Sequence, residues 1–270
     1  MVEANGLRFH VRDEGSGPAV ILLHGFPDTG DLWRNQAPAL VGAGFRVIAP
    51  DMRGRGRSDK PPAVADYGLR NMVGDVTGIL DALGVEKAYV VGHDWGAAVA
   101  WLVGSLAPQR VERLVAMSVG FPGAAGPPDL EALQKMWYRI LITTEATAGE
   151  LFQAEDWYLL RTFLKGAADV EAYIATLSEP GALAAGLNWY RANLPIQSIL
   201  GSRPVPLPPV AAPTLGMWST GDEYLTEAAM VRSADHVAGP WKYERIEDAT
   251  HWIPLDQPDR VNALLLEFLR

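Results

Sequence analysis

The chain has 270 residues, and 49% of them are hydrophobic, which is enough to fill the core of one large α/β domain or of two small ones. Its formal net charge of -9 disfavours nucleic acid and anionic membrane surfaces as partners. The sequence contains no cysteine, which excludes disulfides, thiolate nucleophiles and thiolate metal ligands, so any chemistry must use oxygen and nitrogen groups.

The amino-terminal residues MVEANGLRFH include a glutamate and lack the apolar segment of a secretory signal. No other stretch approaches the roughly 18 consecutive apolar residues of a membrane span. We therefore expect a cytoplasmic protein with neither a membrane nor a nucleic acid as partner. The frequent alanine, glycine and arginine residues favour a bacterial source.

Short apolar runs alternate with helical patterns along most of the chain. Because these runs are apolar on both faces, they predict an α/β fold with a mostly parallel central sheet flanked by helices. The predicted strands lie at 19–25, 45–51, 88–94, 111–119 and 214–220, and the predicted helices at about 33–43, 68–83 and 96–107.

Two polar features of this region are interpreted as structural. The segment RGRGRS, Arg53 to Ser58, is the one candidate for a phosphate contact, but arginines spaced by glycine are typical of a solvated or ion-paired turn. On the helix at 68–83, we expect Asn71, Asp75 and Asp81 to occupy the solvent face.

The alternation stops between Phe121 and about Pro213. Two segments rich in proline and glycine, FPGAAGPPD and GSRPVPLPPVAAP, enclose a helical block rich in aromatic residues. This pattern predicts a helical cap at 123–212, inserted into an α/β core formed by 1–122 and 213–270.

The stretch VVGHDWGAAVAW, residues 90–101, predicts a buried strand that runs through a sharp bend into a helix. The bend has the form of the G-x-S-x-G nucleophile elbow, with Asp94 in place of serine. Small neighbours such as Gly92 and Gly96 leave room for a strained central residue, and the amino-terminal N–H groups of the helix favour an ionised carboxylate. Asp94 is therefore the candidate nucleophile.

Two further groups follow later strands, at the sheet edge where ligands bind in open α/β sheets. Asp222 lies in TGDEYL and His251 in ATHW, so the chain order is nucleophile, acid, base. With a reference pKa near 6.5, His251 is expected to be mostly neutral at pH 7 and to accept a proton from water, while Asp222 holds its tautomer. The HGFP turn after the first core strand nominates the backbone N–H groups of Phe26 and Trp95 as an oxyanion hole.

A carboxylate nucleophile indicates attack at a saturated carbon. Serine would leave an ether there, which water does not readily cleave, whereas Asp94 leaves an ester that His251-activated water can hydrolyse. Epoxide opening and carbon–halogen hydrolysis both meet this description. An epoxide needs a proton donor for its oxygen, for which tyrosine is suited, whereas a halide needs only N–H donors.

The segments HGFP, DMRGRGRSDKP, GHDWGA, LNWYR, GDEYL and THWIPLDQPDRVN together resemble the soluble epoxide hydrolases of the α/β-hydrolase fold. The resemblance runs from about residue 7 to the carboxyl terminus and is weakest in the cap. It implies that two cap tyrosines bind the epoxide oxygen and deliver the proton. Tyr190 of LNWYR corresponds to one and Tyr138 to the other, although RILITTEATAG follows Tyr138 where the family commonly has an aromatic-Gln-x-Pro-Gly stretch.

On this interpretation the chain converts a small hydrophobic epoxide and water to a vicinal diol, with no metal and no organic cofactor. The substrate pocket is expected to include His24, Pro27, Trp137, Trp189 and Trp252. One alternative is a haloalkane dehalogenase, in which Trp95 and a cap tryptophan (Trp137, Trp157 or Trp189) would bind halide. Another is a non-catalytic protein that binds a hydrophobic ligand or a partner. The sequence does not define the oligomeric state.

Overall fold

A computed structural model describes residues 1–124, 129–195 and 206–270. Its main sheet has, among these residues, seven strands in the order β3-β5-β4-β6-β7-β8-β9. All neighbours pair in parallel except β3, which is antiparallel to β5. The strands are β3 (Val11–Gly15), β4 (Ala19–Leu23), β5 (Arg46–Pro50), β6 (Ala88–His93), β7 (Val111–Met117), β8 (Thr214–Gly221) and β9 (Trp241–Thr250).

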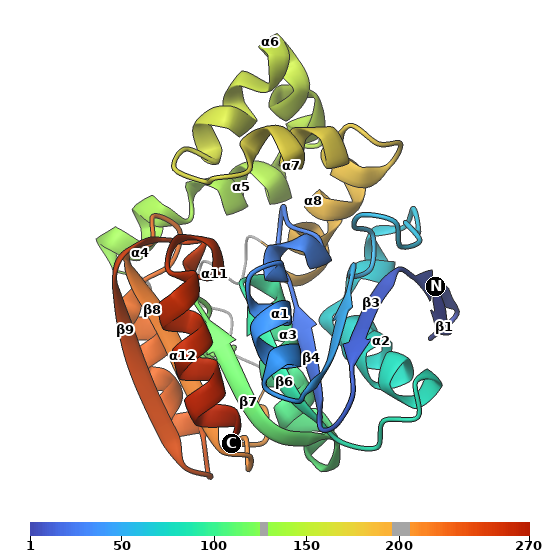
Figure 1. Ribbon diagram of the computed structural model, residues 1–270. Coiled ribbons are helices and arrows are strands. Elements are labelled where there is room, and N and C mark those ends of the chain that lie inside the picture. The colour runs from blue at the N-terminus through green and yellow to red at the C-terminus, as the bar shows by residue number, and fades with distance from the viewer. Residues whose placement is uncertain (125–128, 196–205) are drawn as a thin grey trace.

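The predicted α/β class and mostly parallel sheet are confirmed. Every side chain of β4 is buried, as expected for a strand covered on both faces. In Figure 1 helices α1 and α12 lie in front of the sheet, and α2 and α3 lie behind it. A short hairpin of β1 (Val2–Ala4) and β2 (Leu7–Phe9) precedes the sheet. The core helices are α1 (Gln36–Gly42), α2 (Leu69–Ala82), α3 (Trp95–Leu106), α10 (Glu227–Arg232), α11 (Ile253–Asp256) and α12 (Pro258–Leu269).

One expectation for helix α2 is wrong. Asp75 is buried at 4% exposure instead of facing solvent, because its carboxylate pairs with Arg53, whose Nη2 lies 2.5 Å from Oδ1. Arg55 is also buried, and its guanidinium donates to the backbone carbonyls of Pro27 and Asp28. Arg53 and Arg55 are therefore buried in the core, whereas Arg57 is exposed, and the ion pair of Arg53 agrees with the interpretation of this segment as an ion-paired turn.

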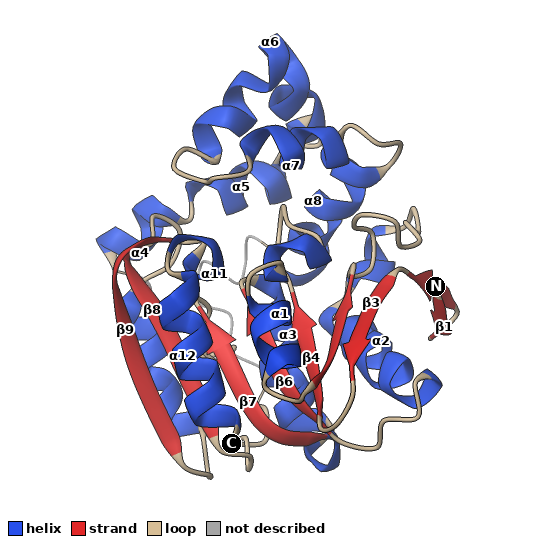
Figure 2. Cartoon of the chain, viewed as in Figure 1, coloured by secondary structure: helices blue, strands red, loops and turns tan. Residues whose placement is uncertain are grey.

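The segment between β7 and β8 is helical. Its helices, called the cap here, lie beyond the carboxyl ends of the strands, as Figures 1 and 2 show. They are α4 (Leu130–Lys135), α5 (Trp137–Thr144), α6 (Ala148–Phe163), α7 (Val170–Leu177) and α8 (Ala182–Asn193). The predicted hinges fall partly on 125–128 and 196–205, outside the described residues, and the boundaries at 123 and 212 stay a prediction. Across the described helices, no segment is both long and apolar enough to span a bilayer.

Candidate active site

Asp94 sits on a strained bend between β6 and α3. Its backbone angles are φ 52° and ψ -123°, a conformation that L-residues rarely adopt. The bend requires glycine on both sides. A Cβ at Gly92 would lie 2.2 Å from the carbonyl oxygen of Gly96, and one at Gly96 would lie 2.0 Å from the carbonyl oxygen of Leu23. The strain directs the Asp94 side chain out of the sheet toward the cap.

The Asp94 carboxylate is held by backbone donors. The N–H of Phe26 donates to Oδ1 at 2.9 Å, and the N–H of Trp95 also bonds the carboxylate. Gly25 leaves the space that this contact needs, because a Cβ there would lie 2.2 Å from Oδ1. Burial disfavours the charge on Asp94, but the bonds and charge of His251 and the backbone donor outweigh it, so the pKa of Asp94 is lowered. The structure thus brings together the predicted nucleophile and both predicted oxyanion donors.

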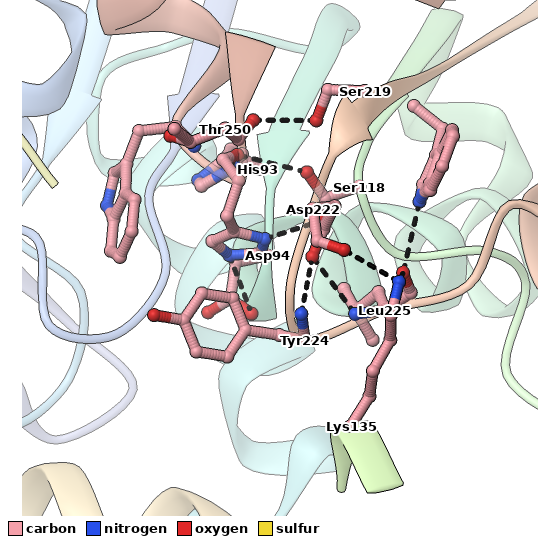
Figure 3. Close-up of polar contacts among 12 residues, drawn as sticks. His93, Asp94, Ser118, Lys135, Ser219, Asp222, Tyr224, Leu225 and Thr250 are labelled. Atoms are coloured by element: carbon pink, nitrogen blue, oxygen red, sulfur yellow. Dashed lines mark hydrogen bonds and ion pairs between the residues drawn. The ribbon is translucent and has the colours of Figure 1, made fainter. Parts of the chain in front are cut away.

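His251 lies between two carboxylates. Its Nδ1 is 2.9 Å from Oδ2 of Asp222, and its Nε2 is 3.6 Å from Oδ2 of Asp94. The other oxygen of Asp222 accepts the backbone N–H groups of Tyr224 at 2.8 Å and Leu225 at 3.0 Å. Figure 3 shows these contacts, in which each oxygen of the fully buried Asp222 carboxylate has a hydrogen-bond partner.

The expected protonation state of His251 is wrong. Burial disfavours the imidazolium, but the charge and hydrogen bond of Asp222, together with Asp94, outweigh burial and raise the pKa of His251 to about 10. The histidine is therefore protonated at neutral pH beside the Asp94 carboxylate, whose own pKa is lowered. The reference pKa of histidine does not predict this protonation, because it applies to a side chain without the neighbouring carboxylates of Asp222 and Asp94.

The loops that carry these groups are tied to each other. The carbonyl oxygen of His251 accepts Nε2–H of His93 at 2.8 Å and the hydroxyl of Ser118 at 3.2 Å. Lys135, at the end of cap helix α4, donates its ammonium to the backbone carbonyls of Asp222 at 2.7 Å and Leu225 at 3.2 Å (Figure 3). The cap therefore contacts the loop that carries Asp222.

Both predicted tyrosines are buried opposite the elbow. Tyr138 of α5 and Tyr190 of α8 have ring centroids 5.8 Å apart, and the ring of Tyr190 meets Trp95 edge-on at 5.0 Å. Burial and the Asp94 charge raise the pKa of Tyr190 well above its usual value. Burial also raises the pKa of Tyr138, against the opposing charge of Arg139. Both phenols are therefore protonated at neutral pH.

These groups enclose one small cavity of about 10 Å³, which has room for about one water molecule. A substrate can occupy it only if side chains or cap helices move apart. Three of its lining residues, Phe163, Leu164 and Tyr224, were not predicted. Tyr224 follows Asp222 by two residues in the GDEYL motif, and this closeness to a predicted site residue could have indicated that it lines the cavity. The full lining is Phe26, Asp94, Tyr138, Phe163, Leu164, Tyr190, Tyr224, His251 and Trp252.

Of the five residues expected in the substrate pocket, only Trp252 lines this cavity. The ring of His24 is held by the N–H of Met52, and Nε1–H of Trp189 donates to the Arg53 carbonyl at 3.0 Å. Trp137 is 44% exposed on the outside of α5.

Pro27 also lies outside the lining, after a cis peptide bond with Phe26. Four of the five residues therefore do not line this cavity, and their place in the substrate pocket stays a prediction. Within 1–124, 129–195 and 206–270, no cluster of three or more histidine, aspartate and glutamate side chains is arranged to hold a metal ion.

Comparisons with known proteins agree with this arrangement. The sequence profile of the alpha/beta hydrolase fold matches residues 18–258. The chain is 32% identical to Epoxide hydrolase A of Mycobacterium tuberculosis, with 100% of this chain and 96% of the relative covered. It is 31% identical to Epoxide hydrolase 4 of Homo sapiens, covering 100% of this chain and 77% of the relative. The crystal structure of Epoxide Hydrolase A from Mycobacterium thermoresistibile superposes with a TM-score of 0.85 at 29% identity, covering 100% of this chain and 97% of that chain.

Proposed function

The chain belongs to the epoxide hydrolase family of the α/β-hydrolase fold, and we propose that it converts epoxides to vicinal diols through a covalent ester on Asp94. One observation carries the proposal. A single cavity holds a carboxylate on a strained elbow, a histidine between two carboxylates and two protonated tyrosines. These are the nucleophile, the base and the acids that epoxide hydrolysis requires.

The first step forms the ester. Oδ2 of Asp94 attacks a ring carbon, the carbon–oxygen bond of the epoxide breaks, and a proton passes from a tyrosine hydroxyl to the oxygen that leaves the carbon. Oδ1 stays bonded to the N–H of Phe26. The phenolate then regains its proton from the imidazolium of His251, which becomes neutral.

Ester formation itself favours this proton loss. Asp94 is one of the two carboxylates that raise the pKa of His251, and its charge disappears when it is alkylated. After alkylation, only the charge of Asp222 still opposes the desolvation that disfavours the imidazolium, so the pKa of His251 falls. The base is thus activated only after the first step has occurred.

The second step hydrolyses the ester. Neutral His251 takes a proton from water, and the water oxygen attacks the carboxyl carbon of Asp94. The oxyanion forms on Oδ1, to which the N–H of Phe26 donates, and the N–H of Trp95 also bonds this carboxyl group. When the tetrahedral intermediate collapses, the diol oxygen leaves with the proton of the newly formed Asp94 carboxyl, and both Asp94 and His251 return to their charged states.

The haloalkane dehalogenase alternative has less support. It needs a cap tryptophan whose N–H faces the cavity, but that of Trp189 donates to a backbone carbonyl and Trp137 points outward. Trp157 is absent from the cavity lining. Diol formation from styrene oxide without halide release from a haloalkane favours the proposal, whereas binding without turnover favours the non-catalytic alternative.

Single-turnover hydrolysis in water enriched in heavy oxygen tests the mechanism. The ester pathway places the water oxygen in the Asp94 carboxyl and the original Oδ2 in the diol, so the Asp94 peptide gains the label and the diol does not. Label in the diol with an unlabelled Asp94 peptide would mean that water attacks the epoxide directly, and the covalent mechanism would be wrong. The variant Asp94→Asn, with no nucleophilic carboxylate, is the control and should form no diol.

A further inference from the structure

The two tyrosines of the cavity have different partners. Nε–H of Arg139 donates to the hydroxyl oxygen of Tyr138 at 3.2 Å, and its guanidinium carbon lies 5.7 Å from the ring centroid. Tyr190 instead packs edge-on against Phe26 and Trp95 and has a side-chain hydrogen bond with Trp95, and both of these neighbours are uncharged. Among the described residues, a cationic donor therefore bonds only one of the two phenol oxygens, that of Tyr138.

The charge of Arg139 favours a phenolate on either tyrosine, but its hydrogen bond goes to Tyr138. In the part of the chain that the structure describes, its side chain makes no ion pair and no other hydrogen bond. Other cap arginines are engaged elsewhere, since Arg161 pairs with Glu171 and Arg191 donates to the Ile142 carbonyl. Arg139 follows Tyr138 directly on α5, so the helix holds the two side chains at a fixed offset.

The bond leaves the Tyr138 hydroxyl free to react. Arg139 occupies a lone pair of the phenol oxygen, and the O–H remains available to donate to an epoxide oxygen. As the proton leaves, charge develops on the same oxygen that Arg139 already contacts. A hydrogen bond from a cation to an anionic oxygen is roughly twice as strong as a neutral one, so Arg139 stabilises the phenolate more than the phenol.

The remaining charged and titratable groups around Tyr138 come from four other segments. Asp94 on the elbow and Asp222 after β8 oppose a phenolate, whereas the His251 imidazolium favours it. Tyr190 on α8 and Tyr224 after Asp222 contribute neutral phenols. Asp94 opposes a phenolate on either tyrosine, so the difference between the two phenols is the hydrogen bond that Arg139 donates to Tyr138.

We propose that Arg139 is a positioning residue that makes Tyr138 the tyrosine that transfers its proton, while Tyr190 only donates a hydrogen bond to the epoxide oxygen. The inference rests on the proposed function. In the transfer, the proton leaves the Tyr138 oxygen for the alkoxide oxygen as the ring bond breaks, and the phenolate keeps the bond from Arg139. The His251 imidazolium later returns a proton to it.

A double-mutant cycle on ester formation tests this role. Excess enzyme is mixed rapidly with styrene oxide, quenched, and analysed for alkylated protein by mass spectrometry. Arg139→Met should slow ester formation by about 10- to 100-fold, the range for a hydrogen bond to a charged group, and leave hydrolysis of the ester unchanged. In the Tyr138→Phe background the same substitution should have no effect, whereas in the Tyr190→Phe background the full factor should remain.

Conservative variants separate charge from packing. Arg139→Lys keeps the cation and should recover most of the lost rate, while Arg139→Gln should not. Arg161→Met, which removes an ion-paired arginine on the outside of the cap, is the matched control and should form ester at the wild-type rate. If Arg139→Met does not fold, Arg139→Gln replaces it in the same double-mutant cycle.

Besides an unchanged rate of ester formation in Arg139→Met, three results would overturn the inference. They are a loss that persists in the Tyr138→Phe background, an equal loss in both chemical steps, and equal rates for the lysine and glutamine variants. A wild-type enzyme that forms ester no faster than Arg139→Met removes this inference alone. A wild-type enzyme that forms no ester with any epoxide removes the proposed function as well.

Discussion

His251 approaches Asp94 less closely than it approaches Asp222, at 3.6 Å against 2.9 Å. The shorter contact orients the imidazole, and the longer one leaves Oδ2 of Asp94 without a tight bond to break before it attacks. The same imidazole faces the ester once it has formed. This asymmetry suits a residue that remains beside the nucleophile in the first step and activates water in the second.

Replacing the base should trap the ester. In His251→Gln, Asp94 can still attack the epoxide, but no group removes a proton from water, so hydrolysis should slow by about 10³-fold or more. Intact-mass analysis after incubation with styrene oxide should show one equivalent of alkylation, which peptide analysis places on Asp94. A variant that turns over at the wild-type rate, or is alkylated elsewhere, would contradict the assigned roles.

Removing the phenol oxygens should slow the first step only. The double variant Tyr138→Phe with Tyr190→Phe leaves the epoxide oxygen without a proton donor and should slow ester formation by about 10²- to 10⁴-fold. Each single variant should lose less, and Tyr138→Phe should lose more than Tyr190→Phe. Quenched-flow kinetics checks this, with Tyr158→Phe, at a 65% exposed cap tyrosine, as the control. An unchanged rate in the double variant would exclude both tyrosines as donors.

The charge of His251 should make stability depend on pH. The pKa of His251 is about 10 in the folded protein, against an ordinary value of 6.5 for histidine, so the folded state binds the proton more tightly. This contribution is fully present below about pH 6.5 and is lost as the pH rises through about 10, at no more than about 1.4 kcal/mol per pH unit. Urea denaturation from pH 6 to 10 should show wild type losing stability relative to His251→Gln. A constant difference would mean that His251 is neutral.

The buried carboxyl group of Asp28 should also make stability depend on pH. Asp28 is 1% exposed; its Oδ1 accepts the Tyr173 hydroxyl at 2.7 Å, and no described atom partners Oδ2. Burial outweighs the Tyr173 bond and raises the pKa of Asp28 to about 7. A raised carboxyl pKa contributes stability that is present below the unfolded value, near 3.8, and is lost as the pH rises through about 7.

Asp28→Asn should therefore stabilise the protein at pH 8, by about 1–3 kcal/mol, because it removes a buried charge with an unsatisfied oxygen. The gain should shrink as the pH is lowered from 7 to 4. Thermal unfolding at a series of pH values measures it, with the exposed Asp235→Asn as the matched control. A variant that is less stable than wild type at pH 8 would show that the ionised carboxylate is stabilising.

Local patterns in the sequence were enough to predict strands β4 to β8, the elbow and the chain order of Asp94, Asp222 and His251. Strands of a parallel sheet are short apolar runs, and their carboxyl ends meet at one edge, so residues that follow different strands can be grouped without knowing the packing. The glycines around Asp94 report a backbone conformation, which is also a local property. The resemblance added Tyr138 and Tyr190, which the structure places in the cavity with Asp94.

Only the tertiary structure decided which way side chains of distant segments face and what charge they carry. Trp189 turns to the Arg53 carbonyl, Asp75 meets Arg53 inside the core, and Tyr224 reaches the cavity from the acid loop. The protonation of His251 and the bond from Arg139 to Tyr138 depend on contacts of a few ångströms. Such contacts arise when helices and loops pack against one another, and neither hydrophobic periodicity nor motif spacing encodes that packing.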